Sequence, residues 1–137
     1  MVMKNDLGKI YDIYFNEVTY SIESRIFDVI GHFDLLSSYI GDKEFLDKFD
    51  NWDKVKTVLG EIVERKEYLE INSKRLRETG KDTTPSRKIV KEFIENEGKQ
   101  ISIGSDAHSI EEIGSGIQEI LSLLANFNRN KVKLFFE

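Results

Sequence analysis

Apolar residues recur along this chain with two alternating periods, one typical of helices and the other typical of strands. Steps of three and four residues give apolar helical faces within 7–22, 52–63, 89–94 and 113–124. Short apolar runs typical of buried strands occupy 26–31, 68–71, 100–104 and 132–136. Because strands alternate with helices, the pattern predicts an α/β fold of four parallel strands joined by right-handed crossovers.

Local signals predict how these elements begin and end. Thr84 followed by Pro85 predicts a helix that begins with proline at its first position. Gly98 suits the end of that helix, and Ser109 with Glu112 resembles a capping box.

The segments between the periodic stretches differ in character. Residues 33–40 read as a short helix or an ordered loop, and the charged segment 42–50 is expected at the surface. The polar stretch 72–84 is rich in Lys, Arg, Thr and Gly. A loop of that length in a compact domain is often functional.

Composition narrows the class of protein. The 137 residues suit one domain, and the absence of cysteine excludes disulfides, thiolate metal sites and thiol nucleophiles. No apolar run reaches the length of a membrane helix or a signal peptide, so we expect a cytoplasmic protein. The net charge of -5 disfavours nucleic-acid binding, which depends on neutralising phosphates.

Three of the predicted strands end on polar residues. His32 follows the first strand, Asn72 the second, and Asp106 and His108 the third; the chain has only these two histidines. The carboxyl ends of parallel strands meet at one rim, where α/β barrels build their active sites. Asp106 and His108 are two positions apart, so an extended backbone would point both to one side.

Each of these residues also has an ordinary structural explanation. His32 could cap a strand, and Asp106 could be a turn residue held by local hydrogen bonds. We favour a helix cap for Asp34 over a role in orienting site residues, and we expect Asn72 to hold a loop rather than to take part in catalysis. The exposure of Glu70 is ambiguous, because alternate residues of a strand face opposite sides.

Taken together, the segments 27–34, 69–72 and 103–108 closely resemble the last motifs of the PHP phosphoesterases, in particular those of the histidinol-phosphate phosphatases. The resemblance extends over nearly the whole chain, from about Tyr14 to Phe136. It implies a distorted (β/α)7 barrel that binds divalent metal ions at the carboxyl ends of its strands and hydrolyses phosphate esters.

The resemblance also implies roles for individual residues. His32, Asp106 and His108 correspond to metal ligands, for which Zn, Mn or Fe are suitable ions. Arg77 lies where these phosphatases often carry a phosphate-binding arginine, and Arg75 is a second candidate. A solvated basic loop is the alternative for both arginines.

The chain departs from the family in one respect. The family's opening His-x-His motif and the further ligands that follow it do not occur in the sequence. We therefore expect residues 1–137 to be a single partial PHP domain, the C-terminal part of the barrel, with little activity alone. An open half-barrel would expose sheet edges and apolar surface, which predicts a homo-oligomer.

Three functions remain in competition at this point. The first is a metal-dependent phosphatase of the histidinol-phosphate type, acting on a phosphorylated small molecule. The second is a non-catalytic binding or assembly module that keeps the fold without the chemistry. The third, a PHP domain linked to nucleic acid as in some polymerases, is disfavoured by the acidic balance.

Overall fold

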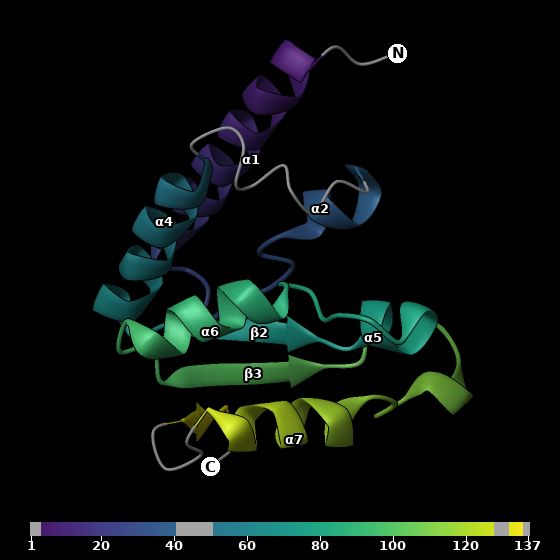
Figure 1. Ribbon diagram of the computed structural model, residues 1–137. Coiled ribbons are helices and arrows are strands. Elements are labelled where there is room, and N and C mark those ends of the chain that lie inside the picture. Colours follow the sequence, from purple (N-terminus) through teal and green to yellow (C-terminus); the bar gives the residue numbers. More distant parts are fainter. Residues whose placement is uncertain (1–3, 41–50, 128–131, 136–137) are drawn as a thin grey trace.

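The computed structural model of the chain describes residues 4–40, 51–127 and 132–135. Helices and short strands alternate along it (Figure 1). In chain order the elements are α1 (Lys4–Ser24), β1 (Val29–Ile30), α2 (Leu35–Ile40), α4 (Asn51–Arg65), β2 (Tyr68–Asn72), α5 (Lys74–Thr79), α6 (Arg87–Glu95), β3 (Gln100–Gly104), the 3-10 helix η1 (Ile110–Glu112), α7 (Ile117–Asn126) and β4 (Lys133–Leu134).

The four strands form one parallel sheet in the order β1-β2-β3-β4. The longest ladder joins β2 to β3, with Leu69 opposite Ile101 and Asn72 opposite Gly104. The edge strands β1 and β4 contribute two residues each. The predicted α/β fold with four parallel strands is confirmed, whereas the larger barrel to which the sheet would belong stays a prediction.

The two faces of the sheet differ in burial. Leu69, Ile71 and Ile101 are fully buried against the helices. The alternating positions, which include Tyr68, Glu70 and Ser102, are only half-buried. The hydrophobic core therefore lies on one face, and the other face carries polar and aromatic side chains.

Helices α1 and α4 lie side by side beyond one end of the sheet, and α6 packs against α4 (Figure 1). The buried side of α1 carries aromatic rings, because Phe15 packs against Tyr11 of the same helix and against Phe33, which follows β1. Trp52 is partly buried against the core, and its ring centroid lies 4.2 Å from Nζ of Lys88.

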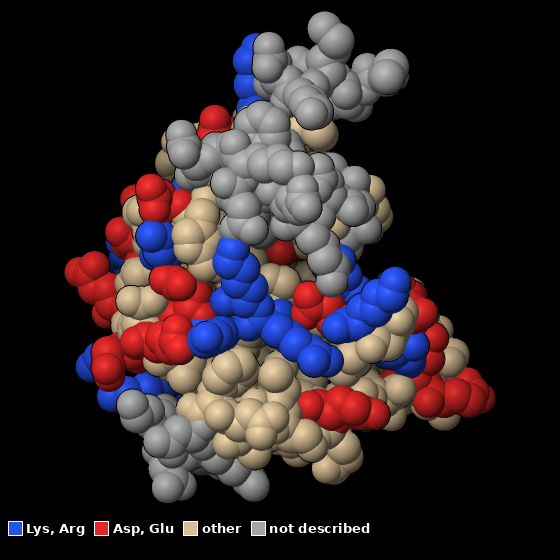
Figure 2. All heavy atoms as spheres, viewed as in Figure 1, with Lys and Arg blue, Asp and Glu red and all other residues tan. Residues whose placement is uncertain are grey.

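Charge is unevenly distributed on the helical face of the molecule. Figure 2 shows basic side chains gathered near the centre of this view, in the region of α6, with acidic side chains around them. The surface in the region of α7 is mostly uncharged, in keeping with its single charged residue, Glu119.

The polar stretch 72–84 is not one long loop. It contains α5, which ends at Gly80 in the left-handed conformation, and its last part returns to β2, where Thr84 and Asn72 form an antiparallel bridge. Two backbone hydrogen bonds make that bridge, with N···O distances of 2.7 and 3.1 Å. The stretch is therefore anchored at both ends beside the end of β2.

Two predicted helix starts are wrong. The Thr84–Pro85 peptide bond is cis, and α6 begins at Arg87 with Ser86 as its cap. Pro85 is therefore not the first helical residue. Ser109 precedes only the short η1 and makes no side-chain cap. Glu112 accepts a hydrogen bond from the amide of His108 and not from that of Ser109, as a capping box would require.

The boundaries of the first and last strands also differ from the prediction. β1 is limited to two residues, and Ile26 and Phe27 before it are exposed. The predicted surface segment 42–50 lies outside the described residues. Within the described ranges, no helix is both long and apolar enough to cross a membrane.

Candidate functional site

A cavity of about 560 Å³ opens at the carboxyl edge of the sheet. Its lining comes from the segments that follow β1, β2 and β3 and from α2 and α5. The strands are parallel and end on the same side of the sheet, and Figure 1 shows β2 and β3 pointing toward α5. The walls of the cavity combine basic, acidic, hydroxyl and aromatic groups from residues His32, Leu35, Tyr39, Asn72, Lys74, Arg75, Glu78, Thr79, Thr84, Asp106 and His108. The three predicted metal ligands therefore line one cavity.

His32 follows β1 in a left-handed backbone conformation, with φ of +52°. Its amide donates a 3.3 Å hydrogen bond to Oε2 of Glu70, and its carbonyl oxygen accepts from the hydroxyl of Tyr14 on α1. Burial raises the pKa of Tyr14 to about 12, so this phenol stays a donor. The backbone of His32 is thus held from both sides, while the residue itself is exposed.

Asp106 and His108 lie on the loop that follows β3. Asp106 also has a left-handed backbone, with φ of +48°, and its side chain is 29% exposed against 66% for His108. Nδ1 of His108 lies 2.9 Å from the carbonyl oxygen of Asp106. Because a carbonyl oxygen can only accept, this contact places the ring hydrogen on Nδ1 and leaves Nε2 of the neutral ring with a free lone pair.

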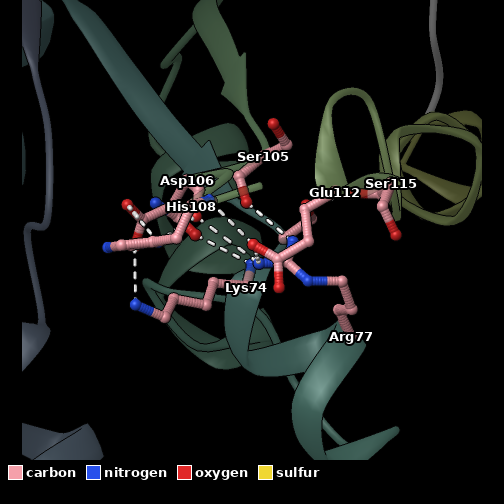
Figure 3. A network of polar contacts seen from close by, with 9 residues as sticks. Lys74, Arg77, Ser105, Asp106, His108, Glu112 and Ser115 are labelled. Atoms are coloured by element: carbon pink, nitrogen blue, oxygen red, sulfur yellow. Dashed lines mark hydrogen bonds and ion pairs between the residues drawn. The ribbon is translucent and has the colours of Figure 1, made fainter. Parts of the chain in front are cut away.

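The donor chemistry suits a divalent ion, but the ligand set is incomplete. Metal-binding histidines commonly donate one ring N–H to a carbonyl oxygen, as His108 does. Within the described part of the chain, however, no group of three or more ligand residues lies close enough to hold an ion. The ammonium of Lys74 also lies 3.5 Å from Oδ2 of Asp106 (Figure 3). These residues offer two donors on one loop, and His32 lies elsewhere on the cavity wall.

The two arginines of α5 point to different surroundings. Arg75 lines the cavity, and its Nη1 lies 3.3 Å from Oγ of Ser37 on α2. Arg77 is not among the residues that line the cavity. Its side chain is only 16% exposed and reaches the loop after β3, as Figure 3 shows.

Asp34 precedes α2, and its carboxylate is buried and faces the hydroxyl and the amide of Ser37 without a well-formed hydrogen bond from the residues that the structure describes, so its role as a helix cap stays a prediction. Burial raises the pKa of Asp34 to about 7, an effect partly offset by the nearby Ser37 hydroxyl and the Arg75 guanidinium. This buried carboxyl group lies behind the wall of the cavity, beside the residues that hold Arg75.

The prediction that Asn72 holds a loop by hydrogen bonding is confirmed. This residue is buried, and its side-chain oxygen accepts a 2.9 Å hydrogen bond from the amide of Lys74. It therefore holds the turn between β2 and α5.

Sequence reasoning missed Glu70, Lys74 and Glu112 as parts of the polar network. The carboxylate of Glu70 lies on the half-buried face of the sheet, where a Cβ added to either Gly31 or Gly104 would approach it within 3.0 Å. A charged residue between two apolar strand positions, opposite small residues on both neighbours, is the signal that could have found it. Lys74 and Glu112 carry no comparable signal, because only the tertiary structure brings them to Asp106 and His108.

Comparisons with known proteins point to one class of enzyme. The chain is 31% identical over 115 residues to a probable histidinol-phosphatase of Thermotoga maritima. The aligned residues make up 84% of the chain and 47% of that protein. It is 29% identical over 133 residues to a probable histidinol-phosphatase of Clostridium acetobutylicum, and this alignment covers 94% of the chain and 50% of that protein. No family model matches the chain.

The chain therefore spans about half the length of the curated relatives that it matches. Both relatives carry the same name, which agrees with the phosphatase class that the strand-end motifs resemble. The similarity supports a relationship to histidinol-phosphatase-like proteins.

Proposed function

We propose that this chain forms part of a phosphate monoester hydrolase of the histidinol-phosphatase type and supplies one wall of its active site. The observation that carries the proposal is that His32, Asp106, His108 and Arg75 line the same cavity at the carboxyl edge of a parallel sheet. The two similar proteins named probable histidinol-phosphatase support the same class.

In this proposal Asp106 and His108 hold a divalent ion (Zn, Mn or Fe), and His32 serves the same centre from the end of β1. Such an ion lowers the pKa of bound water and neutralises phosphoryl oxygens. The carbonyl oxygen of Asp106 keeps the His108 ring oriented with Nε2 free. Because the described residues form no group of three ligands, we expect little activity from the chain alone.

The substrate in this proposal is a phosphorylated small molecule, with its phosphate beside Arg75 and Lys74. Both cations line the cavity, and a guanidinium can bind two phosphate oxygens at once. Ser37 restrains the Arg75 guanidinium from α2. This restraint reduces the side-chain entropy that phosphate binding would otherwise cost.

One observation favours a second function, that of a non-catalytic binding or assembly module. The ligand set is incomplete, and Lys74 places a positive charge beside Asp106 where an ion would compete with it. A module of this kind would keep the anion-binding groups without a metal.

Thermal unfolding with added Mn²⁺ or Zn²⁺ separates the two functions. An ion that binds only the folded chain at about 100 times its Kd adds about 2.7 kcal/mol of stability, so the phosphatase proposal predicts a rise of several degrees in Tm. Asp106→Asn and His108→Ala should remove the rise. Asp53→Asn, an exposed carboxylate on α4, is the matched control and should keep it.

Hydrolysis of histidinol phosphate by the same samples completes the test. A Tm that is unchanged by either metal would favour the non-catalytic module, whereas a lack of phosphate release alone would not, because little activity is expected from the chain by itself. Metal-dependent release that is lost in Asp106→Asn but retained in Asp53→Asn would establish the hydrolase.

We further propose that the chain works as a homo-oligomer. The half-buried sheet face, the two-residue edge strands, and exposed apolar residues such as Ile13 and Tyr20 on α1 support association. Light scattering after size-exclusion chromatography measures the mass directly. A monomer at dilute and at high concentration would contradict this part of the proposal.

A further inference from the structure

The guanidinium of Arg77 is directed into the loop that carries Asp106 and His108. Nη1 donates a 2.8 Å hydrogen bond to the carbonyl oxygen of Ser105, and Nη2 donates a 3.4 Å bond to that of Asp106. Nη2 also lies 3.3 Å from Oε2 of Glu112. One side chain of α5 thus holds three points of the segment 105–112 (Figure 3).

Glu112 completes this contact from the other end of the loop. Its Oε2 accepts a 2.7 Å hydrogen bond from the amide of His108 and receives the Arg77 guanidinium as well. The His108 amide, followed by the positive charge of Arg77, lowers the pKa of Glu112, which therefore stays ionised at neutral pH. A single carboxylate oxygen joins α5 to the backbone of His108.

The carbonyl oxygen of Asp106 links this contact to the imidazole. It accepts from Arg77 and also from Nδ1 of His108, whose ring orientation depends on it. The backbone of Asp106 is in the left-handed region, which aspartate tolerates better than most residues but which still disfavours a side chain. Arg77 and Glu112 supply contacts on both sides of that residue.

We propose that Arg77 is a positioning residue that, with Glu112, sets the orientation of Asp106 and His108, and that Arg75 supplies the guanidinium that faces a bound phosphate. The assignment of ligand roles to Asp106 and His108 rests on the proposed function. The division of labour between the arginines rests on geometry, because Arg75 lines the cavity and Arg77 does not.

Lysine cannot replace Arg77 in this role. A guanidinium directs several N–H groups in a fixed plane, so it reaches two carbonyl oxygens and a carboxylate at once, whereas an ammonium is a point charge on a flexible stem. Arg77→Lys therefore keeps the charge but not the geometry. This difference separates positioning from a general electrostatic effect.

The experiment uses the whole chain with four variants, Arg77→Gln, Arg77→Lys, Glu112→Gln and Arg75→Gln. Lys91→Gln is the matched control, since it breaks an exposed ion pair with Glu95 on α6. Hydrogen exchange of the His108 amide is measured without metal. The visible spectrum and affinity of added Co²⁺ report on ligand geometry, and titration with inorganic phosphate reports on anion binding.

We expect both Arg77 variants and Glu112→Gln to speed exchange of the His108 amide by about tenfold. Arg77→Gln and Glu112→Gln each remove a charged partner of the loop, and Arg77→Lys keeps the charge but cannot reach the two carbonyl oxygens and the carboxylate together. The Co²⁺ spectrum should change in these variants. Arg75→Gln and Lys91→Gln should leave the His108 amide exchange and the Co²⁺ spectrum as they are in the unmodified chain. Phosphate affinity should fall most in Arg75→Gln.

The opposite pattern would overturn the proposal. If Arg77→Gln weakens phosphate binding as much as Arg75→Gln and leaves His108 exchange unchanged, Arg77 contacts the phosphate. If Arg77→Lys matches the unmodified chain in His108 exchange and in the Co²⁺ spectrum, a positive charge at position 77 is enough, and the proposal that the guanidinium geometry positions the loop is wrong. A chain that binds no Co²⁺ contradicts the metal site of the proposed function, and the exchange data then decide the role of Arg77 alone.

Discussion

The carboxylate of Glu70 fills the space above Gly104. A Cβ added to Gly104 would lie 2.5 Å from Oε1 of Glu70, well inside contact distance. The two residues come from neighbouring strands, β2 and β3, near the end of their ladder. The absence of a side chain at position 104 thus allows a charged group to lie on this face, where it accepts from the amide of His32.

This relationship predicts coupling between the two positions. Gly104→Ala should displace the carboxylate and destabilise the chain by roughly 1–2 kcal/mol, the usual cost of overpacking. In a Glu70→Ala background the clash is absent, so the same change should be close to neutral. Urea unfolding of the two single variants and the double variant measures the coupling, and additive effects would contradict it.

Replacing His32 with glycine should stabilise the fold. His32 has φ of +52°, where a Cβ is unfavourable and glycine is not, and the residue is exposed. We expect a gain of about 1 kcal/mol in urea unfolding. Lys66→Gly, with φ of +58° after α4, is the matched control and should gain as much. A loss at position 32 with a gain at position 66 would show that the His32 side chain itself stabilises the fold.

Asp34 should make stability depend on pH. Its pKa is about 7 in the folded chain against a usual 3.8, so the folded state keeps a proton that the unfolded state releases. Stability contributed by this group therefore falls as pH rises from about 4 to about 7, by up to about 4 kcal/mol at about 1.4 kcal/mol per unit. Asp34→Asn cannot ionise and should be the more stable protein at pH 8.

The difference in unfolding free energy between the unmodified chain and Asp34→Asn, measured by urea unfolding from pH 4.5 to pH 8, isolates this group from other carboxylates. We expect the difference to grow with pH and to level off above about pH 7. A constant difference across the range would show that Asp34 is ionised throughout.

Two glycines should respond to alanine with opposite signs. Gly60 lies within α4 with no atom within 4 Å of an added Cβ, so Gly60→Ala should stabilise the helix by about 0.5–1 kcal/mol. At Gly98 an added Cβ would lie 2.5 Å from the carbonyl oxygen of the buried Phe93. Gly98→Ala should therefore cost about 2 kcal/mol or more, and thermal unfolding of both variants checks the pair.

Local sequence signals succeeded where a segment's neighbours in the chain determine its structure. The apolar face of α6 is such a case, because Ile89, Val90, Phe93 and Ile94 are all buried as their spacing predicts. The predicted start of the same helix was wrong, because Thr84 pairs with Asn72, which lies in the neighbouring strand, and the helix begins only at Arg87. A preference of proline for the first turn does not anticipate such a contact.

The side chains of the site show the same division. Alternation of strands and helices was enough to predict that His32, Asn72 and Asp106 follow strands that end at one edge. It did not predict that Arg75 faces the cavity while Arg77, two positions later on a short helix, turns to the neighbouring loop. Glu112 looked like a helix cap, because its spacing from Ser109 fits that pattern, but its partner is the amide of His108.

By itself, the sequence determined the class of fold and the edge of the sheet where the chemistry gathers, because hydrophobic periodicity sets strand and helix, and parallel strands all end on one side. Only the tertiary structure decided which polar groups meet at that edge. Those partners depend on loop backbones, such as the left-handed conformations of His32 and Asp106, and on contacts between residues far apart in the chain.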